Sequence, residues 1–373
     1  MFNLVLHQNK FFFKKFPCKN DAFKVLEFKQ ISLLEKENIK VLKLDLNEEL
    51  SDEVNINKKI LIMKVINNEE FVIIWDNESG IRINIYTNKD NTTSFNEKEF
   101  EFGYKLLKNE FIFNNIKYEN MNPILIYNNG NIIVEGGFSD GKILITNLEK
   151  EKDKEIIEPI FIYHPFDKLP IISLSINNEE NFVILSNSIG VIYIYYVDKT
   201  LWNFKYTLIN HNKCINNIFI SNDMNAFVTC SNDNFVNIIT MPLCKLIRSF
   251  NIKKPRFCFL SEKPLPVCLC YSDDSEEFIV NSINGHLICK VKESNFDNNP
   301  IFFSDYKFCD YIIYLKNSFL ILRSLPYLEE KFNFSLYNDK IYYYRMDIAP
   351  NKNSIYLLDE DNKFILILKD NPK

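Results

Sequence analysis

The sequence predicts an all-β fold built from repeated units, and two observations carry that prediction. The chain of 373 residues contains 33 Phe and 19 Tyr but only three alanines. Helices favour Ala, Leu and Glu, whereas aromatic and β-branched side chains suit the pleated surface of a sheet. A pattern of three strands separated by two polar turns also returns seven times along the chain. A unit of this kind that recurs roughly every 40 to 50 residues is typical of the blade of a β-propeller.

Each unit begins with an alternating apolar strand, continues through a polar turn to a second strand, and ends with a tight turn and a third strand. The third strand is a near-continuous apolar run, such as Val191–Tyr196, which indicates burial on both faces between stacked sheets. We therefore expect seven blades. The units run Lys59–Asn88, Asn122–Glu149, Pro170–Asp198, Cys214–Met241, Pro264–Val291, Phe308–Phe334 and Ile341–Leu368.

The tight turns contain Gly, Asn or Asp in every unit except the sixth, where Tyr314–Ser318 lacks a clear turn. A two-residue hairpin turn needs positive φ angles, and these three residue types adopt such angles at low cost. The sequence therefore predicts that they form the blade turns. The predicted turn residues are Gly80, Asp140, Gly141, Gly190, Asn234, Gly285 and Asn362.

The two ends of the chain are predicted to meet. The seventh unit ends at Leu368, which leaves too few residues for an outer strand. Val41–Leu46 alternates between apolar and polar residues, so we expect it to supply that strand and close the ring. The predicted boundaries are 1–40 for a short N-terminal extension and 41–373 for the propeller.

One helix is expected within the extension. Apolar residues from Ala22 to Leu34 recur at helical spacing, and Asn20 or Asp21 precedes them as a helix cap. Elsewhere, the charged run Glu149–Glu158 is expected to be a solvated loop between blades.

Charge and cysteine content narrow the function classes. The formal net charge of −5 excludes a dedicated nucleic-acid binder with a wide basic surface. The nine cysteines form no C-x-x-C pair, so no metal site or redox motif is predicted. Cys268 and Cys270 lie on one face of an apolar strand and are expected in the core. Free thiols and the lack of any apolar run near 18 residues favour a cytoplasmic protein.

No catalytic or cofactor motif is present. The chain has no G-x-S-x-G elbow and no phosphate-binding G-x-x-x-x-G-K-[ST] loop, and its four histidines form no metal pair. We therefore predict no enzyme, no cofactor and no small-molecule substrate, and we expect protein partners. The basic run Lys253–Arg256 is expected to be a solvated connector, and it leaves peripheral contact with anionic membranes open.

The fourth unit resembles a WD40 repeat. Asn210-His211 precedes the first strand, and Ser231-Asn232-Asp233-Asn234 leads into the last. In that family a His, a Ser or Thr, an Asp and a Trp form a buried hydrogen-bond network. By this resemblance His211, Thr229 or Ser231, and Asp233 correspond to the first three members. The Trp position holds Ile239, so the resemblance implies a truncated network.

A narrower resemblance points to the C-terminal propeller of BEACH-domain proteins, the neurobeachin and Chediak-Higashi group. It rests on Ile132–Asp140, on Phe278–Ile288 and on Gln8–Pro17, which is similar to the end of a BEACH module. The resemblance implies a non-catalytic scaffold in vesicle trafficking or membrane dynamics. The alternatives are a WD40 subunit of another complex, such as a ubiquitin-ligase receptor or an RNA-processing assembly, and a propeller hydrolase.

Overall fold

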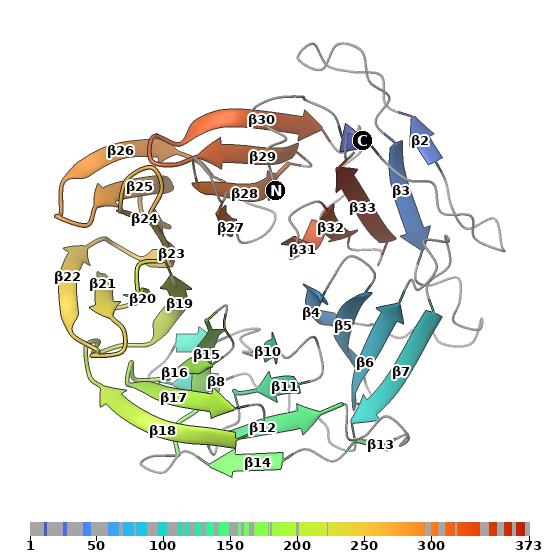
Figure 1. Cartoon of the computed structure of the whole chain (residues 1–373), viewed down its shortest axis with the longest axis horizontal. Coiled ribbons are helices and arrows are strands. Elements are labelled where there is room, and N and C mark those ends of the chain that lie inside the picture. The colour runs from blue at the N-terminus through green and yellow to red at the C-terminus, as the bar shows by residue number, and fades with distance from the viewer. Residues whose placement is uncertain are drawn as a thin grey trace.

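The structure, a computed structural model, is a ring of β-sheets (Figure 1). It describes residues 168–335 with gaps at 178, 180, 199–200, 222, 295–299, 305–309 and 318. Outside that stretch it describes the strands given below and residues 66, 136–137, 141 and 148. Seven sheets of four or more strands make up the ring, and no helix occurs among the described residues. The all-β propeller predicted from the sequence is confirmed.

The sheets are formed by strands in chain order. The first contains β4 (Lys59–Val65), β5 (Glu70–Asn77), β6 (Gly80–Thr87) and β7 (Asn96–Phe102), with β13 (Ile156–Ile157) added to β7. The second contains β10 (Ile124–Tyr127), β11 (Ile132–Glu135), β12 (Lys142–Asn147) and β14 (Ile160–Tyr163). The third contains β15 (Ile171–Ile176), β16 (Phe182–Asn187), β17 (Ile192–Asp198) and β18 (Leu201–Leu208). The fourth contains β19 (Ile215–Ser221), β20 (Ala226–Ser231), β21 (Phe235–Thr240) and β22 (Leu246–Asn251).

The remaining sheets complete the ring. The fifth contains β23 (Pro255–Ser261), β24 (Val267–Ser272), β25 (Glu277–Ser282) and β26 (Leu287–Lys292). The sixth contains β27 (Ile301–Ser304), β28 (Asp310–Lys316), β29 (Phe319–Ser324) and β30 (Glu329–Ser335). The seventh joins β31 (Tyr343–Ile348), β32 (Ser354–Asp359) and β33 (Lys363–Lys369) to β3 (Lys40–Asp45), β2 (Val25–Glu27) and β1 (Phe11–Phe12). A separate two-stranded sheet pairs β8 (Phe111–Phe113) with β9 (Ile116–Tyr118).

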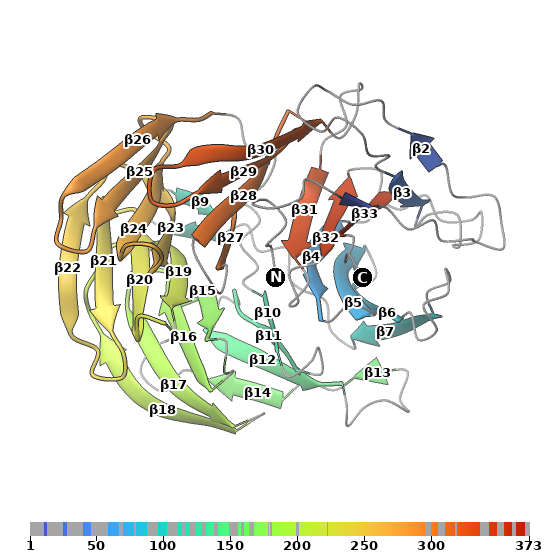
Figure 2. The same ribbon diagram turned by 45° about the horizontal axis from the view of Figure 1, so that its top comes forward.

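The hydrophobic core lies between neighbouring sheets, which stack face to face as Figure 2 shows for β15–β26. Strand β17 illustrates why its sequence is apolar at consecutive positions. Ile192 and Ile194 pack against the fourth sheet, whereas Tyr193 and Tyr195 pack against the second. Because successive side chains of a strand point to opposite faces, a strand between two sheets needs apolar residues at every position. Burying one such side chain contributes about 1.5–3 kcal/mol.

The ring is closed by the N-terminal part of the chain. Strand β3 pairs antiparallel with β33, with Leu42 opposite Leu366 and Leu44 opposite Phe364. This is the pairing that the closure hypothesis for Val41–Leu46 requires. The last sheet therefore combines strands from the two ends of the chain, which Figure 1 shows as neighbouring blue and red arrows.

The helix expected in the extension is wrong for Val25–Glu27, which forms β2 and pairs with β3. The remaining residues of that prediction lie outside the described residues. Helix propensity is a weak prior, and the open edge of β3 offers backbone hydrogen bonds that a short apolar segment can take instead. Part of the charged run also pairs, because β13 (Ile156–Ile157) lies parallel to β7 and is not a loop.

The fifth and sixth predicted units are out of phase with the sheets. Pro264–Val291 covers the second, third and fourth strands of the fifth sheet and omits its first strand, β23. The Gly-containing turn at Gly285 is therefore the turn between the third and fourth strands, one hairpin later than in the fourth sheet. In the sixth sheet, Lys316 pairs with Phe319, so a tight turn does exist there, with Asn317 at a φ of 49°.

Candidate functional site

The residues of the fourth unit that resemble a WD40 repeat lie together at one end of the fourth sheet. His211 precedes β19, Thr229 is on β20, and Asp233 is in the turn between β20 and β21. The His211 Nδ1 atom lies 3.0 Å from Asp233 Oδ2, and its Nε2 atom lies 2.8 Å from Thr229 Oγ1. A carboxylate only accepts, so we assign the proton to Nδ1, and the Thr229 hydroxyl then donates to Nε2.

Asp233 also holds the turn on which it lies. Its carboxylate accepts hydrogen bonds from the backbone N–H groups of Asn212 at 3.1 Å and Phe235 at 3.0 Å. Its side chain is only 6% exposed. The aspartate therefore joins the loop before β19 to the turn before β21.

Ser231 has a different role from Thr229, which the sequence alone left undecided. Its hydroxyl lies 2.9 Å from the carbonyl oxygens of both Lys213 and Cys214, and it accepts a hydrogen bond from the Asp233 N–H group. Ser231 thus fixes the loop backbone, whereas Thr229 contacts the imidazole. Ile239, at the Trp position, packs in the core between the third and fourth sheets.

Asn237 is a member of this cluster that sequence reasoning missed. Its amide nitrogen lies 3.2 Å from His211 Nε2 and donates to the Asn210 carbonyl at 2.9 Å. Asn237 is on β21 two residues before Ile239, so alternation along the strand places it on the same side as the expected Trp. The signal was a polar residue with apolar neighbours on both sides along the strand.

The surroundings of His211 keep the imidazole neutral. Burial lowers its pKa, and the nearby Asp233 carboxylate offsets this only in part. A neutral ring that donates from one nitrogen and accepts at the other suits a structural hydrogen-bond relay.

The predicted turn residues that the structure describes include four with the positive φ angles expected of a tight turn. Positive φ angles occur at Gly141 (74°), Gly190 (90°), Asn234 (70°) and Gly285 (97°). A Cβ atom at Gly190 would lie 2.3 Å from the Lys213 carbonyl oxygen, so this turn also packs against the His211 loop. Gly80 begins β6. Asp140 and Asn362 lie outside the described residues.

A second buried polar cluster joins the fifth and sixth sheets, and nothing in the sequence pattern indicated it. The Glu293 carboxylate, just after β26, accepts hydrogen bonds from Tyr314 Oη at 2.7 Å and Arg323 Nη2 at 3.0 Å. Lys316 Nζ contacts its other oxygen. Burial raises the pKa of Glu293, but the hydrogen bonds from Lys316, Tyr314 and Arg323 outweigh burial and hold it below the ordinary value.

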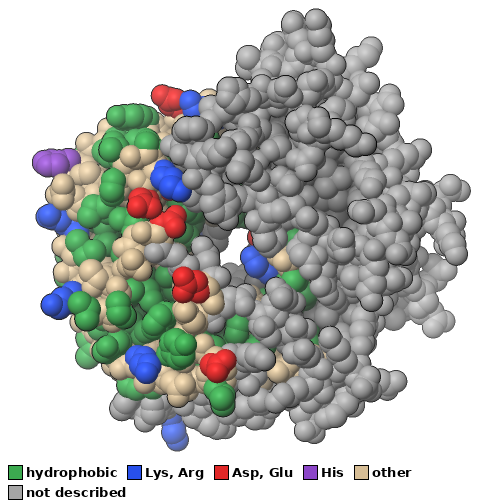
Figure 3. All heavy atoms as spheres, in the orientation of Figure 1, with side chains coloured by type: hydrophobic (Ala, Val, Ile, Leu, Met, Phe, Trp, Pro, Cys, Tyr) green, Lys and Arg blue, Asp and Glu red, His purple; other side chains and the backbone are tan. Residues whose placement is uncertain are grey.

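The basic run Lys253–Arg256 faces an acidic turn. Lys254 Nζ lies 3.9 Å from the Asp274 carboxylate. Burial raises the pKa of Asp273, and Arg256 and Lys254 lower it in part. On the described face in Figure 3, charged side chains of both signs are scattered singly among apolar and polar ones. This surface is therefore of mixed charge.

The cysteines of the fourth and fifth sheets are buried together. Cys268 and Cys270 pack with Cys230 and Cys258 in the core between these sheets, as predicted for the first two. Burial raises the pKa of the Cys268 thiol well above its ordinary value. Among the described residues, no group of three or more His, Cys, Asp or Glu side chains is placed to hold a metal ion, and no helix could cross a membrane.

Comparisons with known proteins bear on the fold. No family model matches the sequence, and no curated protein does. Among solved structures, the chain is similar to the WD40 β-propeller domain of Doa1, with a TM-score of 0.54 and 12% sequence identity, over 85% of this chain and 95% of that one. At this identity the likeness concerns the fold alone. Together with the stacked four-stranded sheets, it shows that the chain has the fold of a WD40 β-propeller.

Proposed function

We propose that this chain is a non-catalytic platform on which other proteins assemble. The observation that supports the proposal best is the WD40 propeller fold itself, because such domains are generally protein-binding scaffolds without catalytic activity. In the described part, apolar cores and the Glu293 cluster fix neighbouring sheets to one another, and the His211 cluster fixes the loop before β19 to the fourth sheet. A rigid ring of this kind presents turns and edge strands as recognition surfaces.

Our finer proposal is that the platform belongs to a BEACH-type scaffold that acts in vesicle trafficking or membrane dynamics. Its support is the resemblance of two segments. Ile132–Asp140 begins with β11, and Phe278–Ile288 spans the hairpin of β25 and β26. The second candidate is a WD40 subunit of a different complex, which the single WD40-like repeat around His211 favours equally.

The size of the native product separates these two candidates. We would detect it in cell extracts under denaturing conditions with an antibody raised against residues 264–373. A band far above the 44.3 kDa of this chain supports a module of a large scaffold. A band at 44.3 kDa refutes the BEACH-type assignment and supports the subunit of a smaller complex.

The platform proposal has its own test. The native protein would be analysed by size under non-denaturing conditions, with chemical cross-linking and mass spectrometry of the same fractions. We expect a discrete complex that contains a second protein in fixed ratio to this chain. Migration as an isolated chain with no cross-linked partner would refute the platform.

A further inference from the structure

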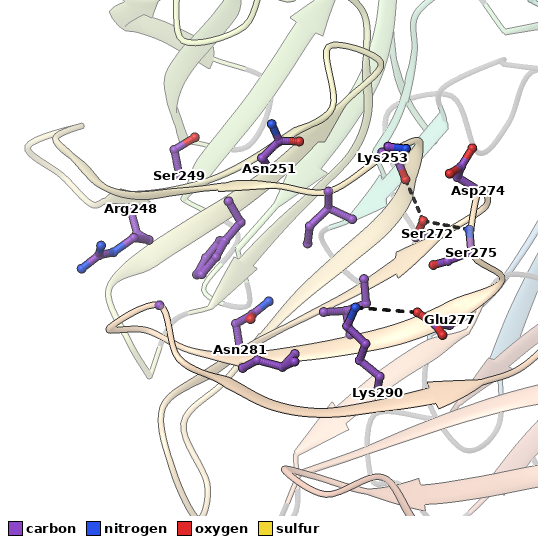
Figure 4. A pocket seen from close by; sticks show the side chains of 15 residues that line it. Arg248, Ser249, Asn251, Lys253, Ser272, Asp274, Ser275, Glu277, Asn281 and Lys290 are labelled. Carbon is purple, nitrogen blue, oxygen red and sulfur yellow. Dashed lines mark hydrogen bonds and ion pairs between the residues drawn. The ribbon is translucent and has the colours of Figure 1, made fainter.

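A groove on the outer rim separates the fourth and fifth sheets. It has a volume of about 670 Å³ and lies between β22 on one side and β25 and β26 on the other (Figure 4). That volume is within the range of about 300–1,000 Å³ that is typical of ligand pockets. The groove is thus large enough to accept several side chains of a partner.

The base of the groove is apolar. Phe250 is on β22, and Ile252 directly follows the end of this strand. Both side chains pack into the core between the two sheets. Ile279 on β25 is half-buried beside them, and Leu287 at the start of β26 is 55% exposed. An aliphatic side chain of a partner could pack on this exposed leucine and on the apolar base beside it.

The acidic side chains of the groove are paired with cations, but two of its basic side chains have no acidic partner among the described residues. Its acidic residues each face a cation, because Glu277 lies 3.9 Å from Lys290 and Asp274 lies 3.9 Å from Lys254. Arg248 and Lys253 are exposed, and neither side chain has a hydrogen bond or an ion pair within the part of the chain that the structure describes. Figure 4 shows them at opposite ends of the groove. Two uncompensated cations therefore stand out on a chain whose net charge is −5.

Strand β22 also has an open edge. It is the last strand of its sheet, and no described strand pairs with its outer side. An extended peptide can add to such an edge through backbone hydrogen bonds, with its alternate side chains turned into an adjacent groove. Arg248 lies on β22, and Lys253 lies in the bend that follows the end of this strand at Asn251.

We propose that this groove binds an extended acidic segment of a partner protein, with two carboxylates on one face of the segment that pair with Arg248 and Lys253 and an aliphatic side chain between them on the same face that covers Leu287. A second copy of this chain fits less well, because pairing β22 with itself would bring two sets of the same cations together. The inference rests on the proposed function as a protein-binding platform and names a site and a partner class for it.

The test uses the purified full chain and a labelled ten-residue threonine-based peptide with Glu at positions 3 and 7 and Leu at position 5, which share one face of an extended chain. Fluorescence anisotropy would measure its affinity. We expect saturable binding that weakens as salt is raised and is lost when both Glu residues are replaced by Gln. Arg248→Glu and Lys253→Glu should each weaken binding about fivefold or more, the upper range for removing one exposed ion pair.

The matched control is Lys205→Glu, which makes the same charge change at an exposed position on β18, the outer strand of the third sheet. It should leave the affinity unchanged, and Leu287→Ala should weaken binding without altering the salt dependence. All four positions are exposed, and a thermal melt would verify that each variant is folded.

Three results would overturn the inference. They are absence of saturable binding, equal binding of the Gln peptide, and equal losses for Arg248→Glu and Lys205→Glu. Self-association of the chain that Arg248→Glu abolishes would assign the groove to a second copy and would also overturn it. None of these outcomes bears on the native complex, so the failure of this inference is distinguishable from the failure of the platform proposal.

Discussion

Removal of the Asp233 carboxylate should destabilise the fourth sheet more than any other single change at its surface turns. Asp233 accepts from the buried His211 imidazole and from two backbone N–H groups. The Asp233→Ala variant leaves the buried His211 N–H without its acceptor and releases both backbone groups.

The expected magnitude follows from these three contacts. A hydrogen bond to a charged acceptor contributes about 1.5–3 kcal/mol, and a neutral donor left unpaired in the interior costs about 1–3 kcal/mol. The two backbone groups lie near solvent and recover part of their loss from water. The free energy of unfolding should therefore fall by about 3 kcal/mol.

Urea-induced unfolding, followed by circular dichroism and by tryptophan fluorescence, would measure this loss. Asp223→Ala is the matched control, because Asp223 is exposed in the turn between β19 and β20 of the same sheet. The control should change the unfolding free energy by less than about 0.5 kcal/mol. An Asp233→Ala loss no greater than that of the control would refute a stabilising role for the His211 cluster.

The same cluster predicts a pH dependence. The pKa of His211 is lowered in the folded state from its ordinary value of 6.5, so the unfolded chain binds the proton more readily. The stability that His211 contributes is therefore present above pH 6.5 and decreases as the pH falls below it. The His211→Gln variant should show a flatter pH dependence of the unfolding midpoint between pH 7 and 5.5, and an unchanged slope would contradict the argument.

Three further predictions concern other contacts between neighbouring sheets and the closure of the ring. Glu293→Gln should lower the unfolding free energy by about 2 kcal/mol, since it removes the ion-pair partner of the partly buried Lys316 and one of the two partners of Arg323. The exposed Glu329→Gln should have almost no effect. The loss should shrink as the pH falls below 4.5, the ordinary pKa of Glu293, and equal effects of the two variants would exclude a structural role. Gly190→Ala should cost about 2 kcal/mol or more in urea unfolding, because its Cβ would meet a backbone carbonyl 2.3 Å away. Gly285→Ala also has a positive φ, but its Cβ would meet only the Arg248 side chain, at an ordinary van der Waals distance of 3.6 Å. It should cost about 1 kcal/mol, and equal losses would contradict the packing argument. Deletion of residues 1–46 removes β3 and should make the chain self-associate in size-exclusion chromatography through the exposed edge of β33, whereas a monomer with an unchanged melting midpoint would refute closure by β3.

Local patterns in the sequence were sufficient for the sheets and for part of the His211 cluster. The alternation of Ile192 and Tyr193 on two faces of β17 is a nearest-neighbour property, so composition and period predict it. The turn at Gly190 is similarly local. The position of the fifth unit relative to its sheet could not be predicted locally. A Gly-containing turn has the same sequence pattern whether it follows the second strand or the third. Only the pairing of β23 with β24 fixes which hairpin Gly285 closes.

Contacts between distant segments could not be predicted in this way. Glu293, Tyr314 and Arg323 are separated by up to 30 positions and meet only because two sheets stack. The strand β2 was misassigned for the same reason, since its partner β3 is placed by closure of the ring and not by neighbouring residues.

The polar clusters also explain how a propeller can keep its fold with little sequence likeness to others. In the third sheet, the Asn187 side chain accepts from the N–H groups of Ile189 and Val191 and so helps to hold its turn. Between the fifth and sixth sheets, the Asp310 carboxylate accepts from Ser261 Oγ at 2.7 Å. Within the fourth sheet, the acceptor is the Asp233 carboxylate, which binds His211. In each of these places a buried side-chain acceptor is hydrogen-bonded, but the residue type differs from place to place. The ring therefore depends on alternating apolar strands and permissive turns. Both features are present here although only one unit resembles a WD40 repeat and the identity to the similar propeller is 12%.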